Sequence, residues 1–308
     1  MNFADVECKA FIFTDELISK ICVSVVFINT ILTMTINCKG KLIDLTEPKV
    51  MGILNVTPDS FFDGGKYKSD KEILLQTEKM LSEGADFIDI GAYSSRPNAD
   101  FVSEKEEIRR MESVMKILSK EFSDVLFSID TFRSEVAKTA LDNGGSIIND
   151  VSAGNLDDQM MKVVAEYQVP YIMMHMRGTP QTMQQQTDYE DMVKKMLFYF
   201  SERIALARQA GILDIIIDPG FGFSKTLDQN YELLSKLDLF QSLELPVMSA
   251  LSRKSMIYKF FETTPQEALN GTSVLNTISL IKGAKLLRVH DVKEAVECVK
   301  LYMKTYEK

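Results

Sequence analysis

Short apolar runs rich in β-branched residues recur along the chain from residue 50 onward, and segments with helical periodicity separate them. There are eight such runs: VMGILNV from Val50, FIDIG from Phe87, LFSID from Leu126, IINDVS from Ile147, YIMMHM from Tyr171, DIIIDPG from Asp214, PVMSALS from Pro246 and KLLRVHD from Lys285. Apolar runs of this length and composition are typical of buried strands. The pattern therefore predicts a strand followed by a helix, repeated along the chain.

Helix starts are marked by a second pattern, in which Ser or Thr is followed three residues later by Glu. This capping box occurs three times, at Ser69 with Glu72, Ser103 with Glu106, and Thr264 with Glu267. Its two side chains bond reciprocally to backbone N–H groups at the start of a helix. Pro265 also stands at a first helical position, where a proline is well tolerated. We predict that a helix begins at each place.

The alternation of strands and helices predicts a parallel sheet covered by helices, as either an open doubly wound sheet or a closed barrel. Eight units favour closure. Neither GxGxxG after the first strand nor GxxxxGK[ST] occurs, so the usual nucleotide-binding patterns of open sheets are missing. The length of 308 residues suits one barrel. We therefore predict an α/β fold, a single-domain (β/α)8 TIM barrel over residues 34–308.

Residues 1–33 fall outside this pattern. Their apolar run, ICVSVVFINTILTM, includes Asn29 and Thr30 and is shorter than the ~20 residues that span a bilayer. A signal peptide begins with basic residues, whereas acidic ones precede this run, so we expect neither secretion nor a membrane span. Two interpretations of residues 1–33 stay open: a dispensable or disordered extension, including a start placed too early, and a terminal helix or strand docked on the fold.

Composition and charge limit the partners and the compartment. Hydrophobic residues make up 45% and charged residues 26% of the chain, as in ordinary globular proteins. The net charge is −9 with no basic tract, which argues against a nucleic-acid partner. The four cysteines, at positions 8, 22, 38 and 298, have no CxxC or metal-ligand spacing. We interpret them as reduced thiols in a cytoplasmic protein.

Polar residues follow every predicted strand. They are Asn55, Ser95 with Arg96, Asp130, Asn149 with Asp150, His175, Asp218, Ser252 with Arg253 and Lys254, and Arg288 with His290. In an eight-fold barrel the active site forms at the carboxyl ends of the strands. Solvated loops also explain polar residues there, so no single position is decisive.

Taken together, these residues combine two kinds of chemistry. Asp130, Asn149 and Asp218 would accept hydrogen bonds from a donor-rich heterocycle such as an aminopyrimidinone. Lys254, Arg288 and His290 would hold a phosphate or pyrophosphate. The alternative is structural: both aspartates would pair with Arg253 or Lys254, and the two histidines would be satisfied core imidazoles. That alternative does not explain why both signs of charge converge.

Several motifs resemble those of dihydropteroate synthases. They are MGILNVTPDSFFDGG, SSRP, the SID, IND and MHM strand ends, DPGFGF, SRKSM and RVH. The resemblance extends from Met34 to the C-terminus in the family's order and spacing. It implies condensation of 6-hydroxymethyl-7,8-dihydropterin pyrophosphate with para-aminobenzoate, releasing pyrophosphate in folate biosynthesis. Sulfonamides compete with the aminobenzoate in this family.

The resemblance also implies roles for individual residues. The pterin would be bound by Asp130, Asn149, Met174, Asp218, Phe223 and Lys254. The pyrophosphate would be held by Asn55, Ser95, Arg288 and His290, with Asn55 also reaching Mg²⁺, which commonly binds through substrate phosphates and few protein oxygens. The aminobenzoate would be bound by Ser95, Arg96, Pro97, Ser252 and Ser255, the last at a helix start. Catalysis would involve Asp130, Lys254, Arg288 and His290.

Two loops are expected to act as lids. The stretch Thr57–Lys68 carries Phe61, Phe62 and two glycines, a composition suited to closing over a ligand, although an ordinary surface loop is the alternative. Pro97–Val102 would be the second lid. The resemblance also implies a homodimer through helices on the barrel exterior.

The chain departs from the family pattern at three positions. Tyr93 stands where glutamate is common in the GES triplet, Ser95 replaces threonine, and Ala250 replaces the glycine before SRK. Three rival functions remain: a pterin-dependent methyltransferase, which needs no pyrophosphate clamp, a pterin-binding barrel without catalysis, and a purely structural partner. The SRK and RVH motifs argue against the first, and Asn55, Arg288 and His290 against the second. The third predicts no convergence of charge.

Overall fold

The computed structural model describes residues 34–56, 70–93 and 102–306, all within one compact unit that begins at Met34. Residues 1–33 lie outside the described residues, and both interpretations of that segment stay predictions. The described chain contains eight parallel strands: β3 (Lys49–Asn55), β4 (Phe87–Gly91), β5 (Leu126–Asp130), β6 (Gly145–Asp150), β7 (Tyr171–Met174), β8 (Ile215–Asp218), β9 (Met248–Ser249) and β10 (Leu286–Val289). Each lies within or overlaps one of the eight predicted runs.

The strands form a closed barrel. Their order is β8-β7-β6-β5-β4-β3-β10-β9, and every neighbouring pair is parallel. A parallel bridge between Ile217 and Val247 joins the two outer strands of that order, and Ile217 N donates to Pro246 O over 3.0 Å. The prediction of a TIM barrel is confirmed.

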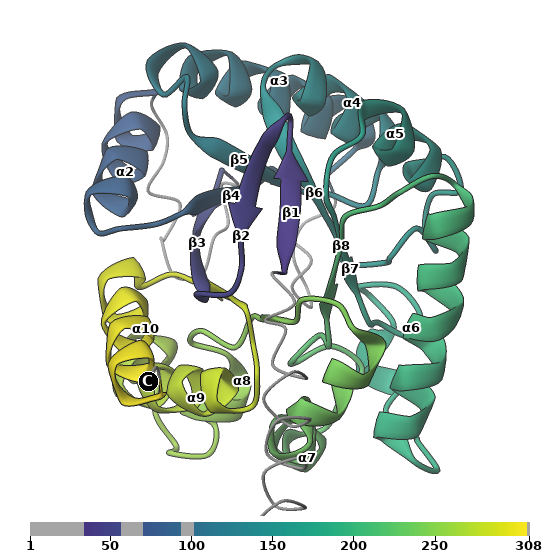
Figure 1. Cartoon of the computed structure of the whole chain (residues 1–308), viewed down its shortest axis with the longest axis vertical. Coiled ribbons are helices and arrows are strands. Elements are labelled where there is room, and N and C mark those ends of the chain that lie inside the picture. The colour runs from purple at the N-terminus through teal and green to yellow at the C-terminus, as the bar shows by residue number, and fades with distance from the viewer. Residues whose placement is uncertain (1–33, 57–69, 94–101, 307–308) are drawn as a thin grey trace, which may run out of the picture. The chain divides into compact units, whose positions relative to one another are not determined.

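Helices surround the strands in a ring, as the view along the barrel shows (Figure 1). They are α2 (Asp70–Ser82), α3 (Glu104–Glu121), α4 (Ser134–Asp142), α5 (Met160–Tyr167), α6 (Met192–Gln209), α7 (Leu227–Ser235), α8 (Ser255–Tyr258), α9 (Leu269–Ile281) and α10 (Val292–Tyr306). Short 3-10 helices span Met183–Gln185, Leu237–Leu243 and Pro265–Glu267.

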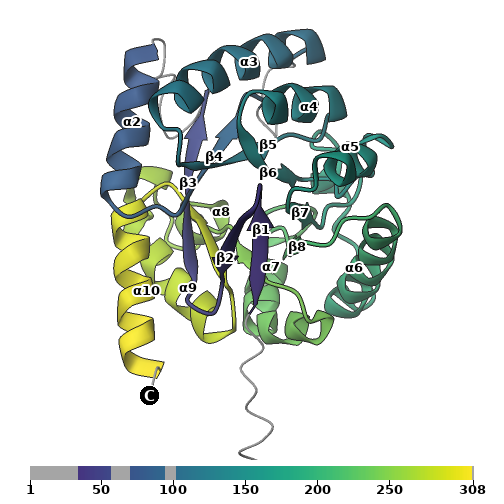
Figure 2. The same ribbon diagram turned by 45° about the horizontal axis from the view of Figure 1, so that its top comes forward.

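The last helix, α10, lies beside the first described one, α2 (Figure 2). Both pack against β3 at Gly52. A Cβ there would lie 2.7 Å from Met80 Sδ of α2 and 3.1 Å from Val292 Cγ2 of α10. The absence of a side chain at Gly52 therefore lets the two ends of the helical ring meet over one strand.

The predicted capping boxes have three different outcomes. Ser103 accepts from Glu106 N, but the carboxylate of Glu106 binds Arg109 and Arg110 instead of the cap backbone, so this box is only half formed. The box of Thr264 and Glu267 is complete, yet it opens the 3-10 helix Pro265–Glu267, and the α-helix begins later, at Leu269. Ser69 lies outside the described residues.

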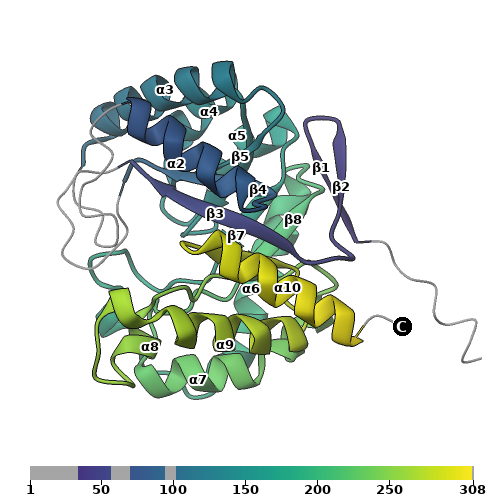
Figure 3. The ribbon, with the colours of Figure 1, turned by 90° about the vertical axis from the view of Figure 1, so that its left-hand side faces the viewer.

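An antiparallel hairpin that the apolar pattern did not predict closes the amino end of the barrel (Figure 3). It consists of β1 (Thr35–Cys38) and β2 (Lys41–Asp44). Its buried residues Ile36 and Cys38, with Leu45 after it, pack on the inward side chains at the starts of the strands, among them Met51 and Phe87. This end of the barrel is therefore an apolar plug, and the polar residues lie at the other end.

Two further predictions concern the cysteines and the membrane. Cys38 and Cys298, the two within the described residues, are free and buried. Burial raises the pKa of the Cys38 thiol to about 12, so it is protonated. No helix among the described residues is long and apolar enough to cross a membrane.

Candidate active site

Four neighbouring strands place their last inward residues in one row. Asn55 pairs in register with Gly91, Gly91 with Asp130, and Asp130 with Asn149. Paired residues of parallel strands point to the same face, so this row faces the barrel interior. A Cβ on Gly91 would lie 3.6 Å from both Asn55 Oδ1 and Asp130 Oδ2. Glycine thus leaves a gap in the row, and the two oxygens border it.

Arg288 on β10 crosses the interior and binds two carboxylates. Its Nε donates to Asp89 Oδ2 over 2.6 Å, and its Nη2 donates to Asp130 Oδ2 over 2.7 Å. Asn149 Nδ2 donates to the same Asp89 oxygen over 3.2 Å. Asp89 is fully buried, and its other oxygen has no partner among the described residues. One carboxylate therefore orients both Arg288 and Asn149, two residues assigned to the ligand from the sequence.

The sequence pattern does not single out Asp89, because this residue lies inside an apolar run and not at a strand end. It sits in the middle of the FIDIG run, between the buried residues Ile88 and Ile90. The period of two along a strand would have revealed it. Phe87, Asp89 and Gly91 share the inward face, so a charge at the second of these positions must lie inside the barrel.

The electrostatics of this cluster follow from its burial. Burial raises the pKa of Asp130 to about 7, and the neighbouring Asp89 adds to the rise while Arg288 opposes it. Burial also disfavours the charged form of Arg288, but the two carboxylates outweigh that effect and raise its pKa above the usual value. Arg288 therefore remains a cation at any physiological pH. Asp89 and Asp130 therefore share the single positive charge of Arg288.

A second group of predicted residues gathers after β7, β8 and β9. Met174 pairs in register with Asp218, and it shares an apolar cluster with Val151 and Phe223. Lys254 Nζ lies 4.8 Å from the centre of the Phe223 ring and donates to Phe221 O over 2.5 Å. The mouth of the barrel thus combines an apolar surface with a cation and a carboxylate.

Asp218 is held by the turn that follows β8. Its Oδ1 accepts from Gly220 N over 2.8 Å. Burial raises its pKa, and Lys254 and the Gly220 N–H oppose the rise. Gly220 has φ +71, and a Cβ there would lie 2.3 Å from His175 O, so the turn requires glycine on both grounds.

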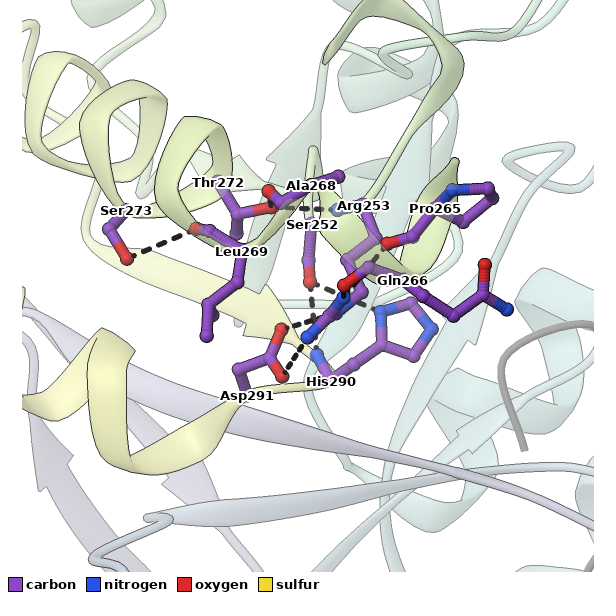
Figure 4. A network of polar contacts seen from close by, with 10 residues as sticks. All are labelled: Ser252, Arg253, Pro265, Gln266, Ala268, Leu269, Thr272, Ser273, His290 and Asp291. Atoms are coloured by element: carbon purple, nitrogen blue, oxygen red, sulfur yellow. Dashed lines mark hydrogen bonds and ion pairs between the residues drawn. The ribbon is translucent and has the colours of Figure 1, made fainter. Parts of the chain in front are cut away.

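Ser252 and His290 are joined by hydrogen bonds (Figure 4). The Ser252 hydroxyl oxygen accepts from His290 N over 3.2 Å and lies 3.1 Å from His290 Nδ1. Ser252 is almost fully buried, with 4% of its surface exposed. The structure therefore shows that Ser252 contacts His290, a residue predicted to bind the pyrophosphate. This contact is in addition to the predicted place of Ser252 beside the aminobenzoate.

Arg253 has a structural task in the same network. It forms two hydrogen bonds of 2.8 Å each to the Asp291 carboxylate, and its Nη1 donates to the carbonyls of Pro265 and Gln266 (Figure 4). In the structural alternative, both aspartates pair with Arg253 or Lys254; the ion pair of Arg253 is with Asp291, whereas Asp218 does interact electrostatically with Lys254. Asp130 pairs with Arg288 instead.

Two other strand-end residues also turn out to be structural. Asp150 accepts from Ser152 N, Gly154 N and the Tyr171 hydroxyl, which uses both of its oxygens in the fold. His175 is buried, with its Nδ1 3.3 Å from Lys225 Nζ. For His175, the interpretation as a satisfied core imidazole is the one that the contacts support.

The remaining predicted residues divide into two groups. Ser255 begins α8 as predicted, although that helix has only four residues. Ser95, Arg96 and Pro97 lie outside the described residues, as do residues 57–69, which include the first expected lid, and residues 98–101 of the second. The structure thus brings together Asn55, Asp130, Asn149 and Arg288 in one cluster, and Met174, Asp218, Phe223 and Lys254 in another.

Comparison with known proteins agrees with this geometry. Residues 51–290 match the family model described as pterin binding enzyme. The dihydropteroate synthase of Escherichia coli (strain K12) is 40% identical over 270 residues, covering 87% of this chain and 95% of the relative. The chain belongs to the dihydropteroate synthase family.

Solved structures of this family superimpose on the fold. The Yersinia pestis dihydropteroate synthase in complex with a sulfonamide drug has a TM-score of 0.84 at 38% identity, covering 88% of this chain and 98% of that one. The Xanthomonas albilineans dihydropteroate synthase with 4-aminobenzoic acid has a TM-score of 0.82 at 35% identity, covering 90% and 99%.

One departure from the family pattern has a clear structural setting. Tyr93, in place of the common glutamate, packs edge-on against Phe132, with 5.3 Å between ring centres. The Arg133 guanidinium lies 5.2 Å from the Tyr93 ring centre, and Gln181 Nε2 donates to the Tyr93 hydroxyl over 2.9 Å. Tyr93 therefore connects the segments after β4, β5 and β7 at the rim of this family's barrel.

Proposed function

We propose that this chain is a transferase that condenses 6-hydroxymethyl-7,8-dihydropterin pyrophosphate with para-aminobenzoate to give 7,8-dihydropteroate and pyrophosphate, a step of folate biosynthesis. The observation that carries the proposal is the Asp89–Arg288–Asp130 cluster, which sets carboxylates and a permanent cation side by side at the carboxyl ends of the strands. The family membership and the names of the relatives support the same reaction.

In this proposal, the pterin ring is recognised by its hydrogen-bond donors. Asp130 and Asp218 accept from them, and Asn149 adds its amide oxygen, because its amide nitrogen already donates to Asp89. Met174 and Phe223 contribute apolar contact with the ring faces, and Lys254 contacts ring acceptors beside Phe223. A ring without the donor edge would leave the remaining acceptor positions of Asp130 and Asp218 without a hydrogen bond, which gives selectivity.

The step that needs help is departure of the pyrophosphate. The bond between the pterin methylene carbon and the pyrophosphate oxygen breaks, and the electron-rich ring delocalises the positive charge that develops. Arg288 uses Nε and Nη2 for its two carboxylates, which leaves Nη1 for the anion. His290, oriented by Ser252, contributes a second donor, and Asp130 favours the charge on the ring.

The amine of aminobenzoate then attacks the methylene carbon and forms the new C–N bond, and its proton passes to the released pyrophosphate or to water. No nucleophilic side chain is required. We assign the aminobenzoate to Ser95, Arg96, Pro97, Ser252 and Ser255, and Ser252 also orients His290. Ser95 also contacts the pyrophosphate in this assignment. Sulfonamides are expected to compete at this place.

We also propose Mg²⁺ as the cofactor, bound with the pyrophosphate and with Asn55. The fit rests on the row at the strand ends, where the hard amide oxygen of Asn55 faces Asp130 Oδ2 across Gly91. Bound Mg²⁺ would supply charge neutralisation on the leaving oxygen. The residues named here hold the remaining parts of the substrate.

Outside the site, we propose a cytoplasmic homodimer that binds neither nucleic acid nor membrane. An apolar patch supports the dimer. Phe260 and Phe261 after α8 are 61% and 62% exposed, and Val274 on α9 is 50% exposed. The Phe260 ring lies 5.7 Å from that of Tyr231 on α7 and 5.1 Å from that of Phe261, measured between centres, and a Cβ on Gly271 of α9 would lie 3.5 Å from Phe261 Cε2. These aromatic side chains therefore link α7 with α9.

The direct test is pyrophosphate release by the purified full chain. The pterin pyrophosphate, para-aminobenzoate and Mg²⁺ are supplied together and then omitted one at a time. We expect release that depends on all three, with dihydropteroate as the product by mass spectrometry. Tight pterin binding without release that depends on aminobenzoate would instead identify a pterin-binding barrel that lacks this chemistry. Transfer of a methyl group from a reduced folate to a corrinoid would support the methyltransferase.

A further inference from the structure

One buried cation has no part in the mechanism above. Lys225 follows the turn after β8 and has only 3% of its surface exposed. Its Nζ donates to Gly220 O and to Phe223 O, over 2.9 Å in each case, and lies 3.3 Å from His175 Nδ1. All three partners belong to the turn after β8 or to the end of β7, next to the proposed pterin site.

The number of partners matches the chemistry of an ammonium group. Lys Nζ carries three protons and no acceptor, so three acceptors satisfy it completely. His175 must then accept through Nδ1 and carry its proton on Nε2. Burial, together with the neighbouring cations Lys225 and Arg177, lowers the pKa of His175 well below its usual value, so the imidazole is neutral as this arrangement requires.

Each of these bonds acts on a residue of the pterin site. Gly220 donates its N–H to Asp218, so fixing the Gly220 carbonyl also fixes that donor. Phe223 carries the ring beside Lys254 and Met174, and its carbonyl is bound by Lys225. His175 N donates to Asp218 O over 3.0 Å, which ties the third partner to the same carboxylate residue.

We propose that Lys225 is a positioning residue for pterin binding: its ammonium folds the turn 220–223 so that Asp218 and the Phe223 ring stand in place before the pterin arrives. The proposal rests on the proposed function, because it deepens the assignment of Asp218 and Phe223 to the pterin. Lys225 does not touch the substrate in this arrangement. It acts through the turn that it holds.

The charge balance at Lys225 suits this task. Burial lowers the pKa of Lys225 to about 7, while Asp218 opposes the fall and Lys254 adds to it. Asp218 therefore favours the charged form of a group that burial disfavours, and the three acceptors around Nζ match that charged form. If Lys225 only filled space, an uncharged side chain of similar size would serve the fold and pterin binding equally well.

The test compares Lys225→Met with the wild type. Methionine has a similar length and no charge, so it removes the three bonds with little change in volume. Lys236→Met is the matched control, because Lys236 forms only a surface pair with Glu232. Lys225→Arg is a second variant, in which a longer planar cation cannot reproduce three bonds from one point.

Two measurements decide the proposal. Without ligand, hydrogen exchange of the peptide covering residues 219–226 should be faster in Lys225→Met and unchanged in Lys236→Met. With ligand, calorimetry should show at least about tenfold weaker binding of the pterin pyrophosphate, the scale expected for lost charged hydrogen bonds. The KM for aminobenzoate should stay within about twofold, because its proposed contacts lie elsewhere.

The outcomes separate this inference from the proposed function. Unchanged exchange in the turn would overturn the role of Lys225, and so would unchanged pterin affinity in Lys225→Met. Full pterin affinity in Lys225→Arg would contradict the three-bond geometry. If the wild type itself does not bind the pterin pyrophosphate, the proposed function fails, and the positioning of pterin residues by Lys225 fails with it. Faster exchange would then record only a local structural contact.

Discussion

A single guanidinium shared by two carboxylates dominates the site at the scale of residues. Arg288 binds Asp89 and Asp130, and Asp89 in turn receives the Asn149 amide. Removing one partner from such a buried group leaves a charge without compensation. Substitutions here therefore act on stability as well as on chemistry, and the two effects have to be measured together.

Asp130→Asn is the cleaner of two tests of this cluster. The amide keeps the size of the side chain and leaves Arg288 paired with Asp89, so we expect a melting temperature near that of the wild type. Turnover should fall by at least about 100-fold, as when one stabilising group is removed from an active site. Steady-state pyrophosphate release and thermal unfolding are the measurements. Asp238→Asn, which changes an exposed carboxylate, is the control. Near-normal turnover in Asp130→Asn would contradict its role.

Arg288→Ala should lower turnover at least as much, but with a second effect. It leaves Asp89 as a fully buried carboxylate without a cation, which destabilises proteins by roughly 3–5 kcal/mol. The loss of stability distinguishes this variant from Asp130→Asn.

Sequence reasoning found most of this cluster and missed its centre. Asn55, Asp130, Asn149 and Arg288 were predicted because each stands at or near the end of an apolar run. Asp89 lies inside such a run, where its partners come from β6 and β10, some 60 and 199 positions further along the chain. Those partners are set by barrel closure, so no local pattern names them.

At the scale of elements, the strands were the easiest part to predict. Inward and outward residues of each strand are both buried, so the strands appear as continuous apolar runs. One apolar run is much longer than its strand: the run from Pro246 to Ser252 contains a strand of only two residues, Met248–Ser249. The rest of that run lies outside the strand, and its last residue, Ser252, forms hydrogen bonds with His290, which directly follows β10.

The hairpin β1–β2 was not predicted because its short strands are half exposed and only a few side chains face the barrel. Ile36 is 1% exposed and belongs to the plug at the amino end. We expect Ile36→Ala to lower the free energy of unfolding by roughly 2–4 kcal/mol, as for other large-to-small core changes. The KM values should not change, since the proposed site is at the opposite end of the barrel.

Chemical denaturation measures this effect, with Leu42→Ala as the matched control on the same hairpin. Leu42 is 68% exposed, so its loss should change stability by less than about 0.5 kcal/mol. Equal effects of the two substitutions would show that the hairpin does not plug the barrel.

At the scale of the whole molecule, the proposed dimer is open to a simple test. Phe260→Glu places a charge in the apolar patch of Phe260, Phe261 and Val274, and we expect it to shift the chain from dimer to monomer by light scattering after gel filtration. Leu301→Glu, at a 71% exposed position on α10, is the control and should remain dimeric. A monomeric wild type, or a dimeric Phe260→Glu, would contradict the proposed interface.

The amino-acid sequence by itself determined the repeating unit, the number of units and the family, because local hydrophobic periodicity and short motifs are properties of neighbouring residues. It also placed the candidate polar residues at the carboxyl ends of the strands. Only the tertiary structure decided which of them touch. The register of the strands around the ring pairs Arg288 with Asp89 and Asp130 and Arg253 with Asp291, and the pairing of β7 with β8 brings His175 to Lys225. Ion pairs form between groups that lie close together in space, and in a barrel those distances are set by the closed sheet.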